Sequence, residues 1–123
     1  NNVRVQIFDT GGRLLDTWAN VLVPWGIWIS PKDEVWVCGS SPMHWRVDPD
    51  YPKAPLGCPP HDQLFMKFTP EGRVLQVTTL PKGRDGHEKP GEVNWLHTLA
   101  LDRSGNVYAG DIIGKRAQKF VRK

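Results

Sequence analysis

The feature that most constrains this chain is an internal repeat. Residues 25–40, WGIWISPKDEVWVCGS, align with residues 97–112, HTLALDRSGNVYAGDI, at a spacing of 72 residues. A second unit, residues 5–18, aligns with residues 65–78, and equivalent positions there lie 60 residues apart. Because one such unit cannot bury both of its faces, it needs copies of itself as neighbours. The repeat therefore predicts an array of similar units that pack face to face.

Each unit reads as a hairpin of short strands in which apolar and polar residues alternate. The turns between strands contain glycines, such as Gly72 and Gly105, where a positive φ is least costly. Four strand types, named a to d, follow the order c, d, a, b, c, d, a, b, c, so only the middle set is complete. The strands are predicted at residues 4–9, 13–18, 26–30, 34–39, 63–69, 73–79, 97–102, 106–111 and 116–122.

A four-stranded unit that recurs every 40 to 50 residues, apart from insertions, is typical of a β-propeller blade. The expected fold is therefore all-β, a propeller of four-stranded antiparallel blades, of which this chain holds about two and a quarter. Residues 1–20 supply strands c and d of a first blade. Residues 21–79 form a complete blade with a long insertion at 40–62, and residues 80–123 supply a loop and strands a, b and c. Such a set cannot close into a ring, so we expect either a fragment or a propeller completed by oligomerisation.

A specific residue pattern supports this interpretation. An aliphatic strand leads into Asp102, Gly105-Asn106-Val107-Tyr108, Asp111, Arg116, Gln118 and Phe120, and the preceding unit adds Phe68, Gly72-Arg73 and Leu75. This order resembles the NHL repeat, whose propellers usually have six blades. The resemblance implies a turn role for Gly72 and Gly105. It also implies that the Asp111 carboxylate, at the end of a b strand, accepts backbone N–H bonds from the turn that follows.

Two insertions interrupt the repeat. Residues 40–62 hold six of the eleven prolines, which excludes a helix or a central strand there. Long loops of this kind are often functional, although a packed cover loop is the alternative. Residues 80–94 are rich in Gly, Pro and charge, and we expect a surface loop. The candidate ligand-binding residues of the first insertion are His44, Trp45, Arg46 and His61.

The entries to the two a strands carry aromatic residues. In propellers the a strands line the central channel, so Trp25 either packs at the seam between blades or belongs to an aromatic surface at the channel mouth. Trp95 and His97 stand at the entry to the second a strand. We therefore count Trp25, Trp95 and His97 among the candidate site residues, with His97 near the propeller axis.

The stretch around His97 also resembles the zinc-binding segment of peptidyl-hydroxyglycine amidating lyases, six-bladed propellers in which G-x-F-x-x-P-H-S-L precedes D-x-x-G-x-V. The resemblance implies a lyase in which His97 is one axial zinc ligand, with zinc or calcium bound in the intact propeller. Leu96 and Thr98 depart from that pattern, and Trp25 stands where a second histidine is expected. The alternative is a histidine hydrogen-bonded at the end of a strand.

The composition indicates which classes of partner and which cellular location to expect. The net charge is only +3 and the basic residues are spread out, which argues against a nucleic-acid partner such as RNA. No apolar run is long enough for a membrane-spanning segment. Cys38 and Cys58 either form a disulfide, which would favour a secreted or periplasmic location, or Cys38 is a buried thiol.

Three functions follow from these observations. The first is a propeller scaffold that binds a protein, a peptide or a small ligand on the face that carries the loops. The second is a metal-dependent, lyase-like enzyme that uses His97. The third is an RNA-binding propeller, which the modest charge disfavours.

Overall fold

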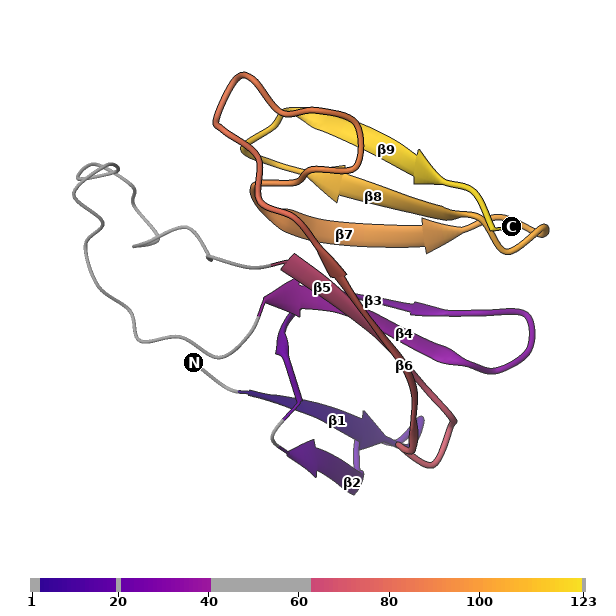
Figure 1. Cartoon of the computed structure of the whole chain (residues 1–123). Helices are drawn as coiled ribbons and strands as arrows, with labels where there is room; N and C mark the ends of the chain where they lie inside the picture. The colour runs from indigo at the N-terminus through magenta and orange to yellow at the C-terminus, as the bar shows by residue number, and fades with distance from the viewer. Residues whose placement is uncertain (1–2, 20, 41–62, 123) are drawn as a thin grey trace.

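The computed structural model describes residues 3–19, 21–40 and 63–122, which form nine strands and no helix (Figure 1). The prediction of an all-β fold is therefore confirmed. His44, Trp45, Arg46, Cys58 and His61 lie outside the described residues. The strands are β1 (Arg4–Phe8), β2 (Leu14–Ala19), β3 (Val23–Ile29), β4 (Val35–Ser40), β5 (Gln63–Phe68), β6 (Val74–Leu80), β7 (Leu96–Leu101), β8 (Val107–Asp111) and β9 (Arg116–Phe120).

The described strands form three antiparallel sheets, ordered β1-β2, β3-β4-β5-β6 and β7-β8-β9. Every hydrogen-bonded pair joins strands that are consecutive in the chain. The sheets follow one another in space as they do in sequence, with β1–β2 below the four-stranded sheet and β7–β9 above it (Figure 1). The fold is thus a series of short meanders, each packed on the next.

Four hairpins use the same five-residue turn. In each, the N–H of the first residue donates to the carbonyl of the fifth, and the N–H of the fourth donates to the carbonyl of the first. The fourth residue has a positive φ in all four turns, which glycine adopts at little cost. The turns are Asp9–Arg13, Ser30–Glu34, Thr69–Arg73 and Asp102–Asn106, with Gly12, Asp33, Gly72 and Gly105 at the fourth position.

The hydrophobic core lies in two clusters, one on each side of the four-stranded sheet. Trp36, Cys38 and Phe65 pack against Leu99 and other residues of β7–β9 on one side. On the other side, Trp18 of β2 packs against Phe68 of β5, with ring centroids 5.2 Å apart. Every residue of β4 is buried as a result, because this strand has a covered face on both sides.

Cys38 is a free and fully buried thiol within the first cluster. This agrees with the expectation of a buried thiol, whereas Cys58, the partner in the alternative disulfide, lies outside the described residues. Burial raises the pKa of Cys38 to about 12, because the thiolate would lose its hydration in the core. The thiol is therefore a small apolar core group rather than a reactive one.

Candidate functional site

Both a strands begin earlier than predicted, and each contains a β-bulge near its start. β3 begins at Val23 and shifts its register against β4 between Pro24 and Gly26. β7 begins at Leu96 and shifts its register against β8 between Leu96 and Thr98. Bulges redirect the side chain of the extra residue. The two extra residues are Trp25 and His97, the same pair that the 72-residue repeat aligns.

The two bulges lie side by side because β3 packs against β7. The Trp25 ring stacks near His97 at a centroid distance of 5.9 Å and an interplanar angle of 30°. It also meets the Trp95 ring edge-on at 5.2 Å. We call these three residues the aromatic cluster. Trp95 is buried, Trp25 is partly buried and His97 is exposed, so the cluster runs from the core to the surface.

Gly26 allows this close approach of the two strands. A Cβ atom at Gly26 would lie 2.9 Å from the carbonyl oxygen of His97 and 3.1 Å from the Cα of Thr98. Real Cβ atoms are almost never found that close to a backbone atom, so a larger residue would push β3 and β7 apart. The position of Trp25 over His97 therefore depends on a glycine next to Trp25.

The backbone beneath the cluster is held by buried polar side chains. The Asp111 carboxylate accepts N–H bonds from Asn94 at 2.8 Å, Trp95 at 2.9 Å and Gly114 at 3.0 Å. The amide oxygen of Gln63 accepts the N–H of Leu96 at 2.6 Å. Asp111 thus bonds to the turn that follows β8 and to the segment that enters β7, so it positions Trp95 as well as its own turn.

Several buried polar atoms of this region have no hydrogen-bond partner among the residues that the structure describes. They include the indole Nε1 of Trp25, the indole Nε1 of Trp95 and the Oδ1 of Asn94. A buried donor without a partner costs about 1–3 kcal/mol. The aromatic cluster therefore contains unpaired donors beside an exposed imidazole, and a ligand oxygen that reached them would relieve that cost.

The cluster does not have the donors that a zinc site needs. Within residues 3–19, 21–40 and 63–122, no group of three or more His, Cys, Asp or Glu side chains could hold a metal ion. Protein zinc sites use three or four such ligands. The nearby thiol of Cys38 stays protonated at neutral pH because of its raised pKa. His97 would thus be one imidazole without a second ligand from this part of the chain.

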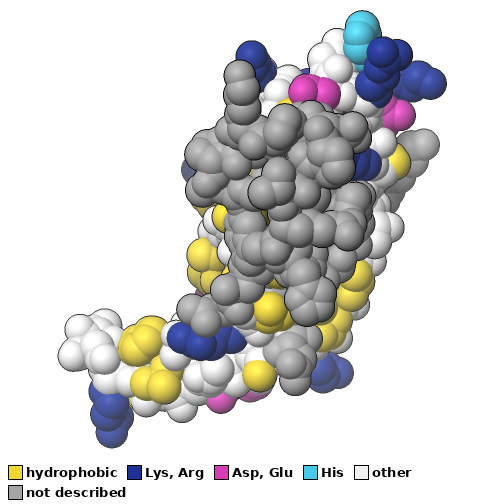
Figure 2. Space-filling view, turned by 90° about the vertical axis from the view of Figure 1, so that its left-hand side faces the viewer, with side chains coloured by type: hydrophobic (Ala, Val, Ile, Leu, Met, Phe, Trp, Pro, Cys, Tyr) yellow, Lys and Arg dark blue, Asp and Glu magenta, His cyan; other side chains and the backbone are white. Residues whose placement is uncertain are grey.

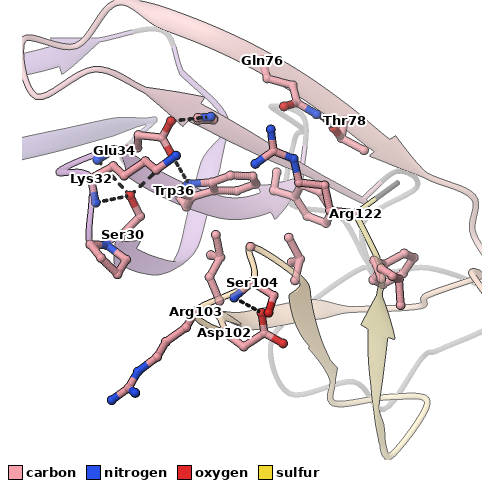
Figure 3. A pocket seen from close by; sticks show the side chains of 18 residues that line it. Ser30, Lys32, Glu34, Trp36, Gln76, Thr78, Asp102, Arg103, Ser104 and Arg122 are labelled. Atoms are coloured by element: carbon pink, nitrogen blue, oxygen red, sulfur yellow. Dashed lines mark hydrogen bonds and ion pairs between the residues drawn. The ribbon is translucent and has the colours of Figure 1, made fainter.

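A cleft lies at the opposite ends of β3 and β7, between the four-stranded sheet and the β7–β9 sheet. This cleft has a volume of about 560 Å³, and its lining includes Trp36, Lys67 and Arg122 (Figure 3). The Lys67 Nζ lies 5.4 Å from the centre of the Trp36 ring and 2.5 Å from a carboxylate oxygen of Glu34. Burial alone would raise the pKa of Glu34, but the hydrogen bond and charge of Lys67, together with hydrogen bonds from Trp36 and Ser30, lower it. Trp36 and Lys67 face each other only because of the β4–β5 register, so their spacing in the sequence does not reveal the contact.

The structure thus brings together Trp25, Trp95 and His97 among the predicted site residues. Gly72 and Gly105 occupy turns with φ values of 85° and 79°, and neither belongs to the aromatic cluster. The sequence interpretation missed Gln63 and Asn94. In the sequence, Gln63 stands at the start of a predicted strand and Asn94 stands next to a tryptophan. Neither position is a specific signal of a functional residue.

The chain matches no protein-family model, and the search of curated proteins returned no match. Among the described residues, no helix is long and apolar enough to cross a membrane.

Proposed function

We propose that this chain is part of an NHL-type β-propeller that binds a peptide segment or a small ligand at the aromatic cluster. The observation that carries the proposal is the contact between β3 and β7, the first strands of two successive sheets. In a propeller the first strand of each blade lies nearest the axis, so neighbouring first strands run side by side. The lateral packing of three meanders in chain order supports the same architecture.

Ligand binding at the cluster is supported by its chemistry. Aromatic rings that extend from the core to the surface offer a large contact area at a low cost in side-chain entropy. The indole N–H groups of Trp25 and Trp95 have no partner in residues 3–19, 21–40 and 63–122, and they favour a ligand with carbonyl, carboxylate or hydroxyl oxygens. Peptides present such oxygens along their whole backbone. The cluster also lies at the end of β3 and β7 from which the long insertion leaves β4, which is the face expected to carry the loops.

The binding proposal is tested with a library of short immobilised peptides, followed by fluorescence titration of the peptides that bind. We expect Trp25→Ala and His97→Ala to weaken binding about tenfold or more, because each removes part of a central aromatic contact. His87→Ala is the matched control, since His87 is an exposed histidine in the loop before β7. Circular dichroism of each variant establishes that the fold is retained. Peptides that bind His97→Ala and Trp25→Ala as tightly as the unchanged chain would contradict the proposal.

The lyase-like alternative rests on the exposed position of His97 at a strand start. It requires further histidines from outside the described residues. Zinc content measured after equilibration separates the two functions. The binding proposal predicts the same zinc content for His97→Ala and His87→Ala, whereas stoichiometric zinc that is lost only in His97→Ala would favour the enzyme.

A further inference from the structure

A second surface is formed by residues outside the aromatic cluster. It is a groove of about 470 Å³ between β1 and β3, lined mainly by apolar side chains that include Val5, Ile7, Trp18, Ile27 and Ile29. Figure 2 shows hydrophobic side chains exposed in the lower part of the molecule, where β1–β2 lie, among acidic and basic side chains. Exposed apolar surface of this kind marks an interaction site more often than chance exposure.

The internal repeat shows how the positions equivalent to this groove are covered in the next sheet. Ile27 is equivalent to Leu99 and Ile29 to Leu101, because both pairs lie 72 residues apart. Leu99 is 3% exposed, since β7 packs against β3 and β4 of the preceding sheet. Ile27 is 55% exposed, and so is Ile29, because in the described part of the chain the sheet that precedes β3 consists of β1 and β2 alone.

The groove continues an interface that already exists. Val5, Trp18 and Val35 line the groove and are also members of the core cluster between the β1–β2 sheet and the four-stranded sheet. In the part of the chain that the structure describes, β1 pairs with β2 alone, so its other edge has no strand beside it. An open edge next to a row of apolar side chains is the arrangement that binds an added strand.

We propose that this groove is the docking site of a β-hairpin of the same repeat type, with the pattern of β3–β4 and β7–β8. Its second strand adds antiparallel to the open edge of β1, and its first strand covers Ile27 and Ile29. This inference uses the repeat architecture of the proposed function but is independent of the ligand site at the aromatic cluster.

The pairing of β4 with β5 predicts the register of the added hairpin. Trp36 pairs with Lys67 and Cys38 with Phe65, and the 60-residue repeat places Ile7 and Val5 at the positions of Lys67 and Phe65. The added strand therefore carries a large aromatic residue opposite Ile7 and a small residue opposite Val5. The known second strands share this pattern, with Trp36 then Cys38, and Tyr108 then Gly110.

The test uses two synthetic peptides as probes, residues 94–112 and residues 23–40, each added to the isotope-labelled whole chain. We expect either peptide to shift the amide signals of Val5, Ile7 and Ile27 and to slow hydrogen exchange along the open edge of β1. Ile27→Lys should weaken this binding about tenfold or more. Val77→Lys is the matched control, because Val77 is 54% exposed on β6 and lies outside the groove, and it should change the affinity less than about twofold.

Three outcomes would overturn the inference. The first is that neither peptide shifts the signals of β1. The second is equal loss of binding in Ile27→Lys and Val77→Lys. The third is a concentration-dependent dimer, formed without peptide, that buries Ile27 and Ile29 against β1 of the second copy, since the groove would then have no place for a hairpin. The readouts at Val5 and Ile7 lie on β1, outside the aromatic cluster, so failure here is separate from failure of the peptide-binding proposal.

Discussion

The two faces of the four-stranded sheet are covered by neighbours of different completeness. One face packs against β7–β9, which includes the first strand of the next sheet, and buries Leu99 on that strand. The other face packs against β1–β2, which covers Val35 and Val37 but leaves Ile27 open. Residues at equivalent repeat positions thus differ in burial because of the neighbouring sheet, and their own apolar character does not decide it.

The comparison of the two faces predicts its largest effect as a difference in stability between substitutions at Leu99 and at Ile27. We expect Leu99→Ala to lower the free energy of unfolding by about 2–5 kcal/mol, because it leaves a cavity between two packed sheets. The equivalent change Ile27→Ala should cost less than about 1 kcal/mol, because much of that side chain already contacts water. Chemical denaturation of both variants measures the difference. Equal costs would mean that the two positions are buried alike in solution.

A second prediction concerns the outer part of the β1–β2 interface. A Cβ atom at Gly72 would collide with the indole of Trp18, whereas one at Gly12 would meet nothing within 4 Å. Both glycines have nearly the same φ, 85° and 83°, so the backbone strain of an alanine is about 1–2 kcal/mol in each. Gly72→Ala should cost about 1–3 kcal/mol more than Gly12→Ala, as overpacking does. Thermal or urea unfolding gives both values, and equal destabilisation would contradict a packed Trp18.

A smaller effect is expected at Asp33, beside the groove. Asp33 has a φ of 58° at the turn position that glycine occupies in the other three turns. Asp33→Gly removes this strain but adds freedom to the unfolded chain, so we expect a stabilisation of only about 0.5 kcal/mol. Gly105→Asp is the reciprocal variant at the equivalent turn and should destabilise. The same sign for both changes in urea unfolding would show that the two turns are not equivalent.

The smallest effect concerns the pH dependence of the Asp102 turn, which is equivalent to the turn at Asp33 in the next sheet. Hydrogen bonds from the side chain and backbone of Asn106 lower the pKa of Asp102 from 3.8 to about 2. Because the folded state favours the carboxylate, its contribution is complete above about pH 4 and is lost as the pH falls through about 2. An NMR titration of the Asp102 carboxyl carbon should give a midpoint near 2. A midpoint at 3.8 or higher would show that the turn does not hold the carboxylate.

Much of this fold could be predicted from the sequence, because strand alternation and turn glycines are local signals. The positions of Gly72 and Gly105 fix where two hairpins turn, and the repeat aligns Trp25 with His97. The bulges at these two residues could not be predicted, because a bulge breaks the two-residue period on which the strand prediction depends.

Contacts between side chains on different strands were harder to predict from the sequence. Lys67 faces Trp36 because of the β4–β5 register. Ile27 is exposed because the neighbouring β1–β2 sheet does not cover it. Neither fact is present in the local sequence of either residue. Likewise, the carboxylate of Asp111 was expected to bond to its own turn, but its bonds to Asn94 and Trp95 depend on how the segment before β7 packs.

The side-by-side arrangement of β3 and β7 is the central claim, and it can be tested directly by nuclear Overhauser spectroscopy of the labelled chain. The structure predicts cross-peaks from the indole protons of Trp25 to the imidazole protons of His97 and to the indole of Trp95, given centroid distances of 5.9 Å and 5.2 Å. Gly26→Val, which forces the two strands apart, should remove them while the β3–β4 cross-peaks persist. An unchanged chain in which Trp25 shows cross-peaks to β4 but none to His97 or Trp95 would contradict the arrangement and the proposed ligand site together.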